Sequence, residues 1–342
     1  LGYPPPALEK CRCGSHAREF MSDVMIEARD LTKHYGTVTA LKNATFEVKR
    51  GEVVGFLGPN GAGKTTTMKI LTCFIAPSEG TARVAGADIF EDPIAVRKAI
   101  GYLPESTPLY TEMLVLEYLE FAGKMRGLNG EGLQTRLRKV VEETSLGDVI
   151  GKSIGELSKG FRQRVGLAQA LIHEPPVLIL DEPMSGLDPN QASEIRELIR
   201  EIGRERTIIL STHNLAEVRV TCGRVLIISQ GQLVADDTPD ELAARAGKPR
   251  FIATLRRNGH SAADIREAFS KIGDAQSVKD HDGSGPNELV IEVVPKGSQD
   301  LRADIFQTAV AADLVLLGLE QRGENLEDIF RQLTTGGAGA QP

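Results

Sequence analysis

Short, unbroken apolar runs recur along the first two thirds of the chain, and helix-like segments separate them. Three such runs cover residues 53–57, 177–180 and 207–211. A strand that is covered on both faces of a parallel sheet needs unbroken apolarity of this kind. The alternation of strands and helices from about residue 24 to about residue 240 therefore predicts an α/β fold with a largely parallel sheet.

Two segments stand out against this alternation. Residues 112–172 have helical periodicity and few strand signals, which predicts a helical subdomain inserted in the α/β domain. Residues 226–234 read as two strands around a tight turn. We also expect a helix over residues 65–74, directly after the first apolar run.

The pattern changes again after residue 249. The segments then follow the order strand, helix, strand, strand, helix, strand, which resembles a small ferredoxin-like unit. We therefore divide the chain into a disordered leader (1–22), an α/β domain (24–246), a small α+β C-terminal domain (250–334) and a flexible tail (335–342). Met21 directly precedes the first strand-like run, so a second expectation is that residues 1–20 lie upstream of the natural start.

Composition excludes several classes of protein. The net charge is −7, from 40 basic and 47 acidic residues, and the scattered basic residues form no footprint for nucleic acid. No apolar run approaches the roughly 20 residues that cross a bilayer, so we expect a cytoplasmic protein that reaches a membrane only through a partner. Cys11, Cys13 and His16 lack a second ligand pair at zinc-like spacing, and we expect no metal there.

A glycine-rich loop carries the strongest chemical signal. It follows the run 53–57, precedes the expected helix and fits the phosphate-loop pattern G-x-x-x-x-G-K-[ST] in full, as Gly58, Pro59, Asn60, Gly61, Ala62, Gly63, Lys64, Thr65 and Thr66. Its backbone N–H groups and the start of the next helix favour phosphate oxygens. Lys64 should reach the β- and γ-phosphates, and the Thr65 hydroxyl should ligate Mg²⁺. The loop predicts a protein that binds and hydrolyses ATP.

Two carboxylates end the apolar run 177–180. A buried polar pair at this place is costly unless it is used. We expect Asp181 to hold Mg²⁺ through water and Glu182 to orient or polarise the attacking water. Two strand-end caps would be the plain alternative, but the phosphate loop upstream favours the catalytic interpretation.

Four further motifs occur in a recognisable order around this pair. They are Tyr35, the segment 157–164 (Leu-Ser-Lys-Gly-Phe-Arg-Gln-Arg), the segment 185–188 (Ser-Gly-Leu-Asp) and the segment 211–213 (Ser-Thr-His). With the phosphate loop and the carboxylate pair they resemble the ABC-type ATPases over residues 24–240. The resemblance identifies 157–164 as the signature motif, 185–188 as the D-loop and His213 as the switch histidine. It also implies that Tyr35 stacks on adenine, although a lone aromatic residue or histidine is more often part of a core.

The resemblance implies how the site works. Lys64, Glu182 and His213 would be the catalytic groups. Ser158, a natural helix N-cap, would face the γ-phosphate of a second subunit together with Gly160 and Asp188. The active unit would then be a head-to-tail dimer with two ATP molecules sandwiched between the phosphate loops and the signature motifs.

Local similarity points to one branch of the family. Segments 102–110, 157–169 and 324–330 resemble the ABC-2 type, gliding-motility and multidrug-export branch. This implies an exporter whose ATPase lies on the cytoplasmic face of the membrane, where residues 106–116 touch a separate integral-membrane permease. The alternative is a soluble ABC-type ATPase acting on ribosomes or DNA. One ATPase unit, no long heptad segment and an acidic balance disfavour that alternative.

Two positions depart from the family pattern. Glu105 stands where the family usually has Gln, and Lys159 stands where the signature usually has Gly. An ionised Glu adds charge near the metal and cannot donate a hydrogen bond. We expect Glu105 to ligate Mg²⁺ in place of the Gln, so that Glu105→Gln retains much of the ATPase activity. The transported substance stays open, because its recognition would lie mainly in the permease.

Overall fold

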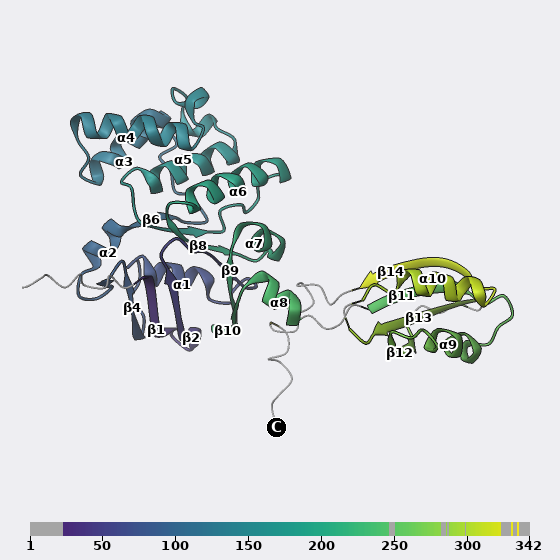
Figure 1. The fold of residues 1–342 in the computed structure, drawn as a ribbon. Helices are drawn as coiled ribbons and strands as arrows, with labels where there is room; N and C mark the ends of the chain where they lie inside the picture. The colour runs from purple at the N-terminus through teal and green to yellow at the C-terminus, as the bar shows by residue number, and fades with distance from the viewer. Residues whose placement is uncertain are drawn as a thin grey trace, which may run out of the picture.

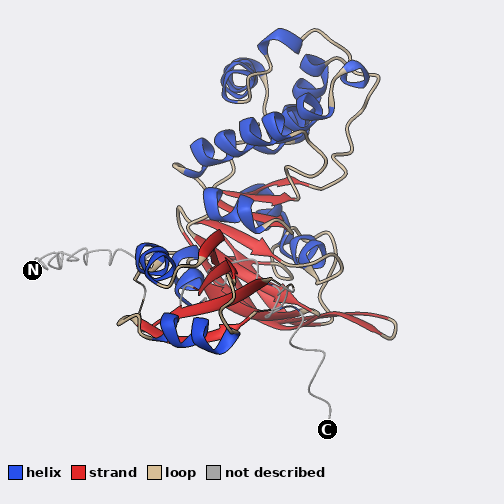
Figure 2. Ribbon diagram, turned by 90° about the vertical axis from the view of Figure 1, so that its right-hand side faces the viewer, coloured by secondary structure: helices blue, strands red, loops and turns tan. Residues whose placement is uncertain are grey.

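The structure is a computed structural model that describes residues 23–245, 250–281, 285, 287–297, 299–322, 330 and 334. The expected leader and flexible tail lie outside the described residues. The described strands form three sheets, two before residue 246 and one after residue 249 (Figures 1 and 2). Within the described part of the chain, no helix is long and apolar enough to cross a membrane.

The first of these is a six-stranded sheet in the order β10-β9-β3-β8-β7-β6, parallel except for β10. Its strands are β3 (Val53–Leu57), β6 (Ile100–Leu103), β7 (Val177–Asp181), β8 (Thr207–Thr212), β9 (Arg224–Ser229) and β10 (Gln232–Asp237). In this register Leu57 lies beside Thr212, and Asp181 lies beside Ser211. The carboxyl ends of β3, β7 and β8 therefore meet at one edge, which positions the candidate site.

The second sheet is antiparallel and was not anticipated from the sequence. Its order is β2-β1-β4-β5, from strands β1 (Val24–Tyr35), β2 (Val38–Lys49), β4 (Glu79–Val84) and β5 (Ala87–Asp88). Strand β2 buries alternate residues at Ala44, Phe46 and Val48. This period of two is the mark of a strand with one face on the core.

The helices of the α/β domain differ from the expected segments mainly at their ends. They are α1 (Lys64–Leu71), α2 (Pro93–Ala99), α6 (Pro189–Gly203), α7 (Leu215–Thr221) and α8 (Pro239–Arg245). The helix expected over residues 65–74 ends at Leu71. The Thr72 hydroxyl donates back to the carbonyl of Met68, and Cys73 has a φ of +55°, which ends the helix.

The expected helical subdomain consists of α3 (Val115–Met125), α4 (Gly130–Glu143), two short 3₁₀ turns (Gly147–Val149 and Ile154–Glu156) and α5 (Lys159–Leu171). Figure 1 shows α3, α4 and α5 gathered away from β1, β2 and β4. Helix α4 begins with a polar, glycine-containing first turn, and Leu133, Arg136, Leu137 and Val140 are its buried residues.

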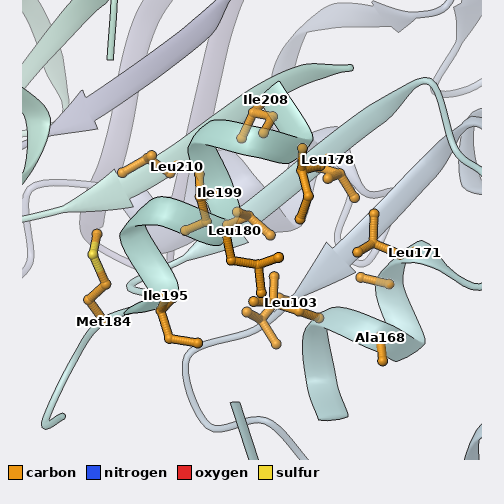
Figure 3. Close-up of a cluster of buried hydrophobic side chains, with 14 of the residues drawn as sticks. Leu103, Ala168, Leu171, Leu178, Leu180, Met184, Ile195, Ile199, Ile208 and Leu210 are labelled. Atoms are coloured by element: carbon orange, nitrogen blue, oxygen red, sulfur yellow. The ribbon is translucent and has the colours of Figure 1, made fainter. Parts of the chain in front are cut away.

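A continuous apolar core joins the helices to the six-stranded sheet. Figure 3 shows strand residues such as Leu178 and Leu180 beside helix residues such as Ile199 and Leu171, and all four are fully buried. The contact between α5 and β6 is close enough to require a glycine. A Cβ atom at Gly101 would lie 2.2 Å from the backbone oxygen of Ala170.

The third sheet forms the small C-terminal unit. Its antiparallel order is β12-β13-β11-β14. The strands are β11 (Arg250–Arg256), β12 (Ala275–Asp280), β13 (Glu288–Pro295) and β14 (Val315–Arg322), and the helices α9 (Ala262–Ser270) and α10 (Arg302–Ala311) follow β11 and β13. This is the ferredoxin-like arrangement that the sequence predicts. Phe251, Phe269 and Ile291 are fully buried in its own core.

Two described residues beyond β14 pack with the α/β domain instead. Phe330 contacts the core that contains Leu242, and the Ser229 hydroxyl donates to the carbonyl of Thr334 at 3.3 Å. The sequence analysis had included both residues in the small domain. The chain thus returns to its first unit after completing the second.

Candidate active site

The phosphate loop connects β3 to α1 and is shaped by close backbone contacts. A Cβ atom at Gly58 would lie 2.4 Å from the Ile228 oxygen, and one at Gly63, whose φ is +110°, would lie 2.6 Å from the Ala40 oxygen. The loop also accepts a hydrogen bond of 2.9 Å from Gly231 to the Ala62 oxygen. Asn60, Gly61, Thr65 and Thr66 line an open cleft above it together with Lys64. These contacts fix a phosphate-sized turn at the start of a helix.

Lys64 is buried, and its ammonium group contacts three oxygen atoms. Its ammonium donates to the carbonyl oxygens of Gly58 at 2.7 Å and Pro59 at 3.2 Å, and it lies 3.3 Å from Oε1 of Glu182. Both partners of this ion pair are more than nine-tenths buried. A charge so far from water is tolerated because it is paired and hydrogen-bonded.

Glu182 lies between two cationic or titratable side chains. Its other oxygen, Oε2, is 2.9 Å from Nδ1 of His213, whose ring is half exposed in the same cleft. An ionised carboxylate only accepts hydrogen bonds, so Nδ1 donates and carries the proton. The φ of Glu182 is +49°, a left-handed conformation that is uncommon for a residue other than glycine and typical of functional sites. The three predicted catalytic residues, Lys64, Glu182 and His213, are therefore in contact.

Asp181 leaves one oxygen free at the end of β7. Its Oδ1 accepts from the Ser211 hydroxyl and from the Thr65 hydroxyl at 3.4 Å, whereas the buried Oδ2 has no partner. A buried, unpaired carboxylate oxygen beside a hydroxyl fits Mg²⁺, which prefers oxygen ligands and retains water. No cluster of three or more Asp, Glu, His or Cys that could hold a metal occurs among the described residues. A metal here would therefore depend on phosphate oxygens for its remaining ligands.

Ser211 has a role that the sequence analysis did not assign. Besides donating to Asp181, its hydroxyl accepts from the backbone N–H of Glu182 at 3.0 Å, so it holds both acidic residues. The signal was available in principle. Ser211 ends an apolar strand as Asp181 does, and the ends of neighbouring parallel strands meet at one sheet edge.

The predicted signature residues lie apart from this cleft. Ser158 caps α5 by accepting from the Phe161 N–H at 3.3 Å, and Gly160 lies against Gln191, whose Oε1 would be 2.8 Å from an added Cβ. Both line a hollow that shares no lining residue with the phosphate cleft. Asp188 caps α6 by accepting from Asn190 and Gln191, at 3.0 Å each. One chain therefore does not bring Ser158, Gly160 and Asp188 to its own Lys64.

Tyr35 and Glu105 differ in their relation to the cleft. Tyr35 ends β1 with about half of its surface exposed, and the Lys33 ammonium lies 5.4 Å from its ring centroid. It does not line the phosphate cleft, whereas Glu105 does. Beside Glu105, Tyr102 faces Asp181, and burial, helped by that carboxylate, raises the pKa of Tyr102 to about 12. Adenine stacking on Tyr35 stays a prediction.

Comparison with known proteins places the sequence among transport ATPases. The family described as ABC transporter matches residues 41–185. The uncharacterized ABC transporter ATP-binding protein YxlF of Bacillus subtilis is 32% identical over 90% of this chain and 98% of its own length. The linearmycin resistance ATP-binding protein LnrL of the same organism is 31% identical over 91% of this chain and 98% of its own length.

Solved structures support the same fold. The ATP-binding cassette MJ0796, in a dimeric post-hydrolysis state bound to ADP and phosphate, superimposes with a TM-score of 0.58. It shares 25% identity with this chain and covers 63% of it and 98% of its own length. The matched share of this chain corresponds to an ATPase cassette without the small C-terminal unit.

Proposed function

This chain belongs to the ABC transporter ATP-binding proteins, and from that premise we propose that it drives the export of small, drug-like molecules through an ABC-2 type permease. It binds and hydrolyses ATP, as its family does. The name of LnrL, a resistance protein, supports export as the direction of transport. The substance exported by this chain would be selected mainly by the permease.

The observation that carries the chemistry is the placement of Glu182 between Lys64 and His213. When phosphate enters the cleft, Lys64 exchanges its contact with Glu182 for phosphate oxygens. The carboxylate is then free to take a proton from a water molecule whose oxygen attacks the γ-phosphorus. The bond to the leaving ADP breaks, and ADP and inorganic phosphate are the products. His213 keeps Glu182 oriented and lines the same cleft, where it would contact the γ-phosphate.

Mg²⁺ would be held by the Thr65 hydroxyl and by the free Oδ2 of Asp181, directly or through water, with Glu105 as a third ligand. When bound, the metal would supply positive charge that neutralises the phosphates. The unpaired Oδ2 supports this assignment. Asp181 is held for this purpose by Ser211, so its orientation does not depend on nucleotide.

The complete site would need a second copy of the chain. Ser158 and Gly160 open onto a hollow separate from the phosphate cleft, and Ser158 is exposed. In a head-to-tail dimer the start of α5 would direct its N–H groups at the partner's γ-phosphate. Nucleotide binding would close this interface and hydrolysis would reopen it. The bound nucleotide would thus shift the equilibrium between open and closed dimers through its contacts with both chains. The dimeric MJ0796 cassette supports the arrangement.

The permease would dock beside the loop that follows β6. Tyr110 (58% exposed) lies in that loop and contacts the exposed Phe121 of α3, and the exposed Leu114 and Met125 (72% exposed) lie at the two ends of α3. The Tyr110 ring lies 5.8 Å from that of Phe121. An exposed apolar group of this kind is typical of a protein contact. The chain would then work as a peripheral protein on the cytoplasmic face of the membrane.

Co-purification tests the proposal. The tagged chain is expressed with the membrane protein encoded beside it and purified from detergent-solubilised membranes. We expect a stable complex whose ATPase activity rises with a drug-like substrate in proteoliposomes, and the Tyr110→Ser, Met125→Ser variant should lose the permease while it keeps nucleotide binding. Recovery of bound RNA or DNA without any integral-membrane partner would overturn the transporter assignment in favour of a soluble ABC-type ATPase.

A further inference from the structure

A second hollow flanks the magnesium end of the phosphate cleft. It is lined by Thr65, Lys69, Tyr102, Glu105, Lys159 and Asp181, among others. These residues come from α1, from β6 and the loop after it, from the end of β7 and from the first turn of α5. The hollow thus brings Lys159, from the segment expected to face another subunit, next to the metal site of its own chain.

The position of Lys159 is set by the D-loop. A Cβ atom at Gly186 would lie 2.3 Å from the Lys159 ammonium nitrogen, so the side chain lies directly over this glycine. Gly186 also has a φ of +66°, which favours glycine in its own right. The ammonium group is therefore directed across the D-loop within its own chain.

Two charges in this hollow have no partner of their own. Among the described residues, neither the Glu105 carboxylate nor the Lys159 ammonium makes a hydrogen bond or an ion pair, and both side chains are exposed. The second cation, Lys69, lies 6.0 Å from the ring centroid of Phe74. Asp181 already supplies one negative charge. A second carboxylate beside it is unfavourable unless a cation compensates it.

We propose that Lys159 is a positioning residue whose ammonium, across the shared hollow and without a direct ion pair, compensates the charge of Glu105 of the same chain beside the magnesium site. Glu105 and Lys159 then act together, as one nearly neutral unit joining the loop after β6 to the start of α5. The inference rests on the magnesium site of the proposed function. Loss of Lys159 alone leaves an uncompensated carboxylate near the metal and the phosphates, whereas loss of both charges does not.

A double-mutant cycle tests the pairing through rescue. ATPase rates of Lys159→Gln, Glu105→Gln and the double variant are measured against Mg²⁺ concentration. We expect Lys159→Gln to lower the rate about tenfold, within the range for residues in direct contact. Whatever rate Glu105→Gln alone gives, the double variant should return to that level. Lys159→Arg, which keeps the charge, should stay near wild type.

Lys152 provides the matched control. It is an exposed lysine in the same connection before α5, but it does not line the hollow. Lys152→Gln removes the same charge, so it should leave the rate unchanged and should not respond to Glu105→Gln. If the effects of Lys159→Gln and Glu105→Gln simply add, the two residues do not act as a pair.

Cross-linking gives a readout that needs neither nucleotide nor metal. E105C and K159C are combined in a chain whose Cys11, Cys13 and Cys73 are replaced. Cys222 can stay, because burial raises the pKa of its thiol to about 12 and makes it unreactive. A short bis-maleimide should join the two positions within one chain, which mass spectrometry of the digested monomer band detects.

The two experiments separate the possible failures. A cross-link that joins two chains would mean that Lys159 acts across the dimer and would overturn the inference. A cross-link within one chain, combined with an ATPase that does not depend on Mg²⁺, would instead contradict the proposed metal site. An E105C/K152C pair serves as the geometric control and should cross-link less.

Discussion

The phosphate cleft and the signature surface differ in how much of their bonding one chain completes. In the cleft, Lys64 and Glu182 are buried and paired with each other, and Ser211 holds the acidic residues from the next strand. On the signature surface, Ser158 and Lys159 are exposed, and within the described part of the chain the Ser158 hydroxyl bonds only to its own helix. The ends of β3, β7 and β8 thus form one half of a site in which the side chains are already held in place. The start of α5 presents the other half, whose side chains face away from the chain's own cleft.

Removing the general base should have the largest effect. Glu182→Gln keeps the shape of the side chain but can no longer take a proton from water. We expect the ATPase rate to fall about 10²–10⁴-fold, while nucleotide binding, followed with a fluorescent ATP analogue, is retained. Glu205→Gln, at an exposed position after α6, is the control and should leave the rate unchanged. Equal losses in the two variants would contradict the role of Glu182.

Blocking the signature surface should have the next largest effect and should be repaired by a partner. Ser158→Arg places a bulky cation on the start of α5, and we expect about 10²-fold slower hydrolysis, as for the loss of a transition-state donor. Mixed with Lys64→Ala chains, it should regain single-turnover hydrolysis, because such a heterodimer contains one intact composite site. An ATPase rate per subunit that stays constant on dilution through dissociation would show that each chain works alone.

The contact between β6 and α5, which joins the two regions, should be sensitive to a single added methyl group. Gly101→Ala drives a Cβ atom toward the Ala170 oxygen, and overpacking of this kind costs about 1–3 kcal/mol in the free energy of unfolding. Gly132 is the matched control, because it lies in α4 with no atom near an added Cβ. Gly132→Ala should stabilise the protein by about 0.5–1 kcal/mol. Urea unfolding of both variants measures the difference, and equal midpoints would contradict the close packing of α5 on β6.

A partly buried histidine that bonds to the end of α2 should give the smallest effect, a change with pH. Burial, with a contribution from Arg126, lowers the pKa of His173 from 6.5 to about 4, and its buried Nδ1 has no partner among the described residues. The unfolded chain therefore binds an extra proton between these values. The contribution of His173 to the free energy of unfolding is fully present above about pH 6.5 and is lost as the pH falls toward 4. His173→Gln should flatten this part of the profile in thermal unfolding, and an unchanged slope would exclude His173 as the cause.

The sequence predicts the catalytic residues at the strand ends well, because they directly follow short apolar runs whose structure depends on neighbouring residues. An unbroken apolar run bounded by glycine or acidic residues has few alternatives, and β3 and β7 begin where the runs begin. Helix ends depend on weaker signals. Helix α1 ends earlier than its sequence pattern suggests, because the Thr72 hydroxyl donates to the Met68 carbonyl and Cys73 is left-handed.

Contacts between distant segments were harder to foresee. The antiparallel sheet was not predicted, and its pairing of β1 with β4 joins segments that lie far apart in the chain. Lys159 and Glu105 were each recognised as unusual, yet their common hollow depends on how α5 packs on β6. Tyr35 was expected to stack on adenine; it ends β1 and does not line the phosphate cleft, and its contact with adenine stays a prediction.

The return of the chain to its first unit has a consequence for how the protein could be remodelled. Leu242, before the ferredoxin-like unit, and Phe330, after it, belong to the same core. In genetic terms, residues 250–322 are an insertion between two anchored ends rather than an appended module. Such a unit can be exchanged or deleted by joining its flanks, without removing the last contacts of the ATPase. The inserted unit can thus vary in this cassette while the catalytic machinery stays constant.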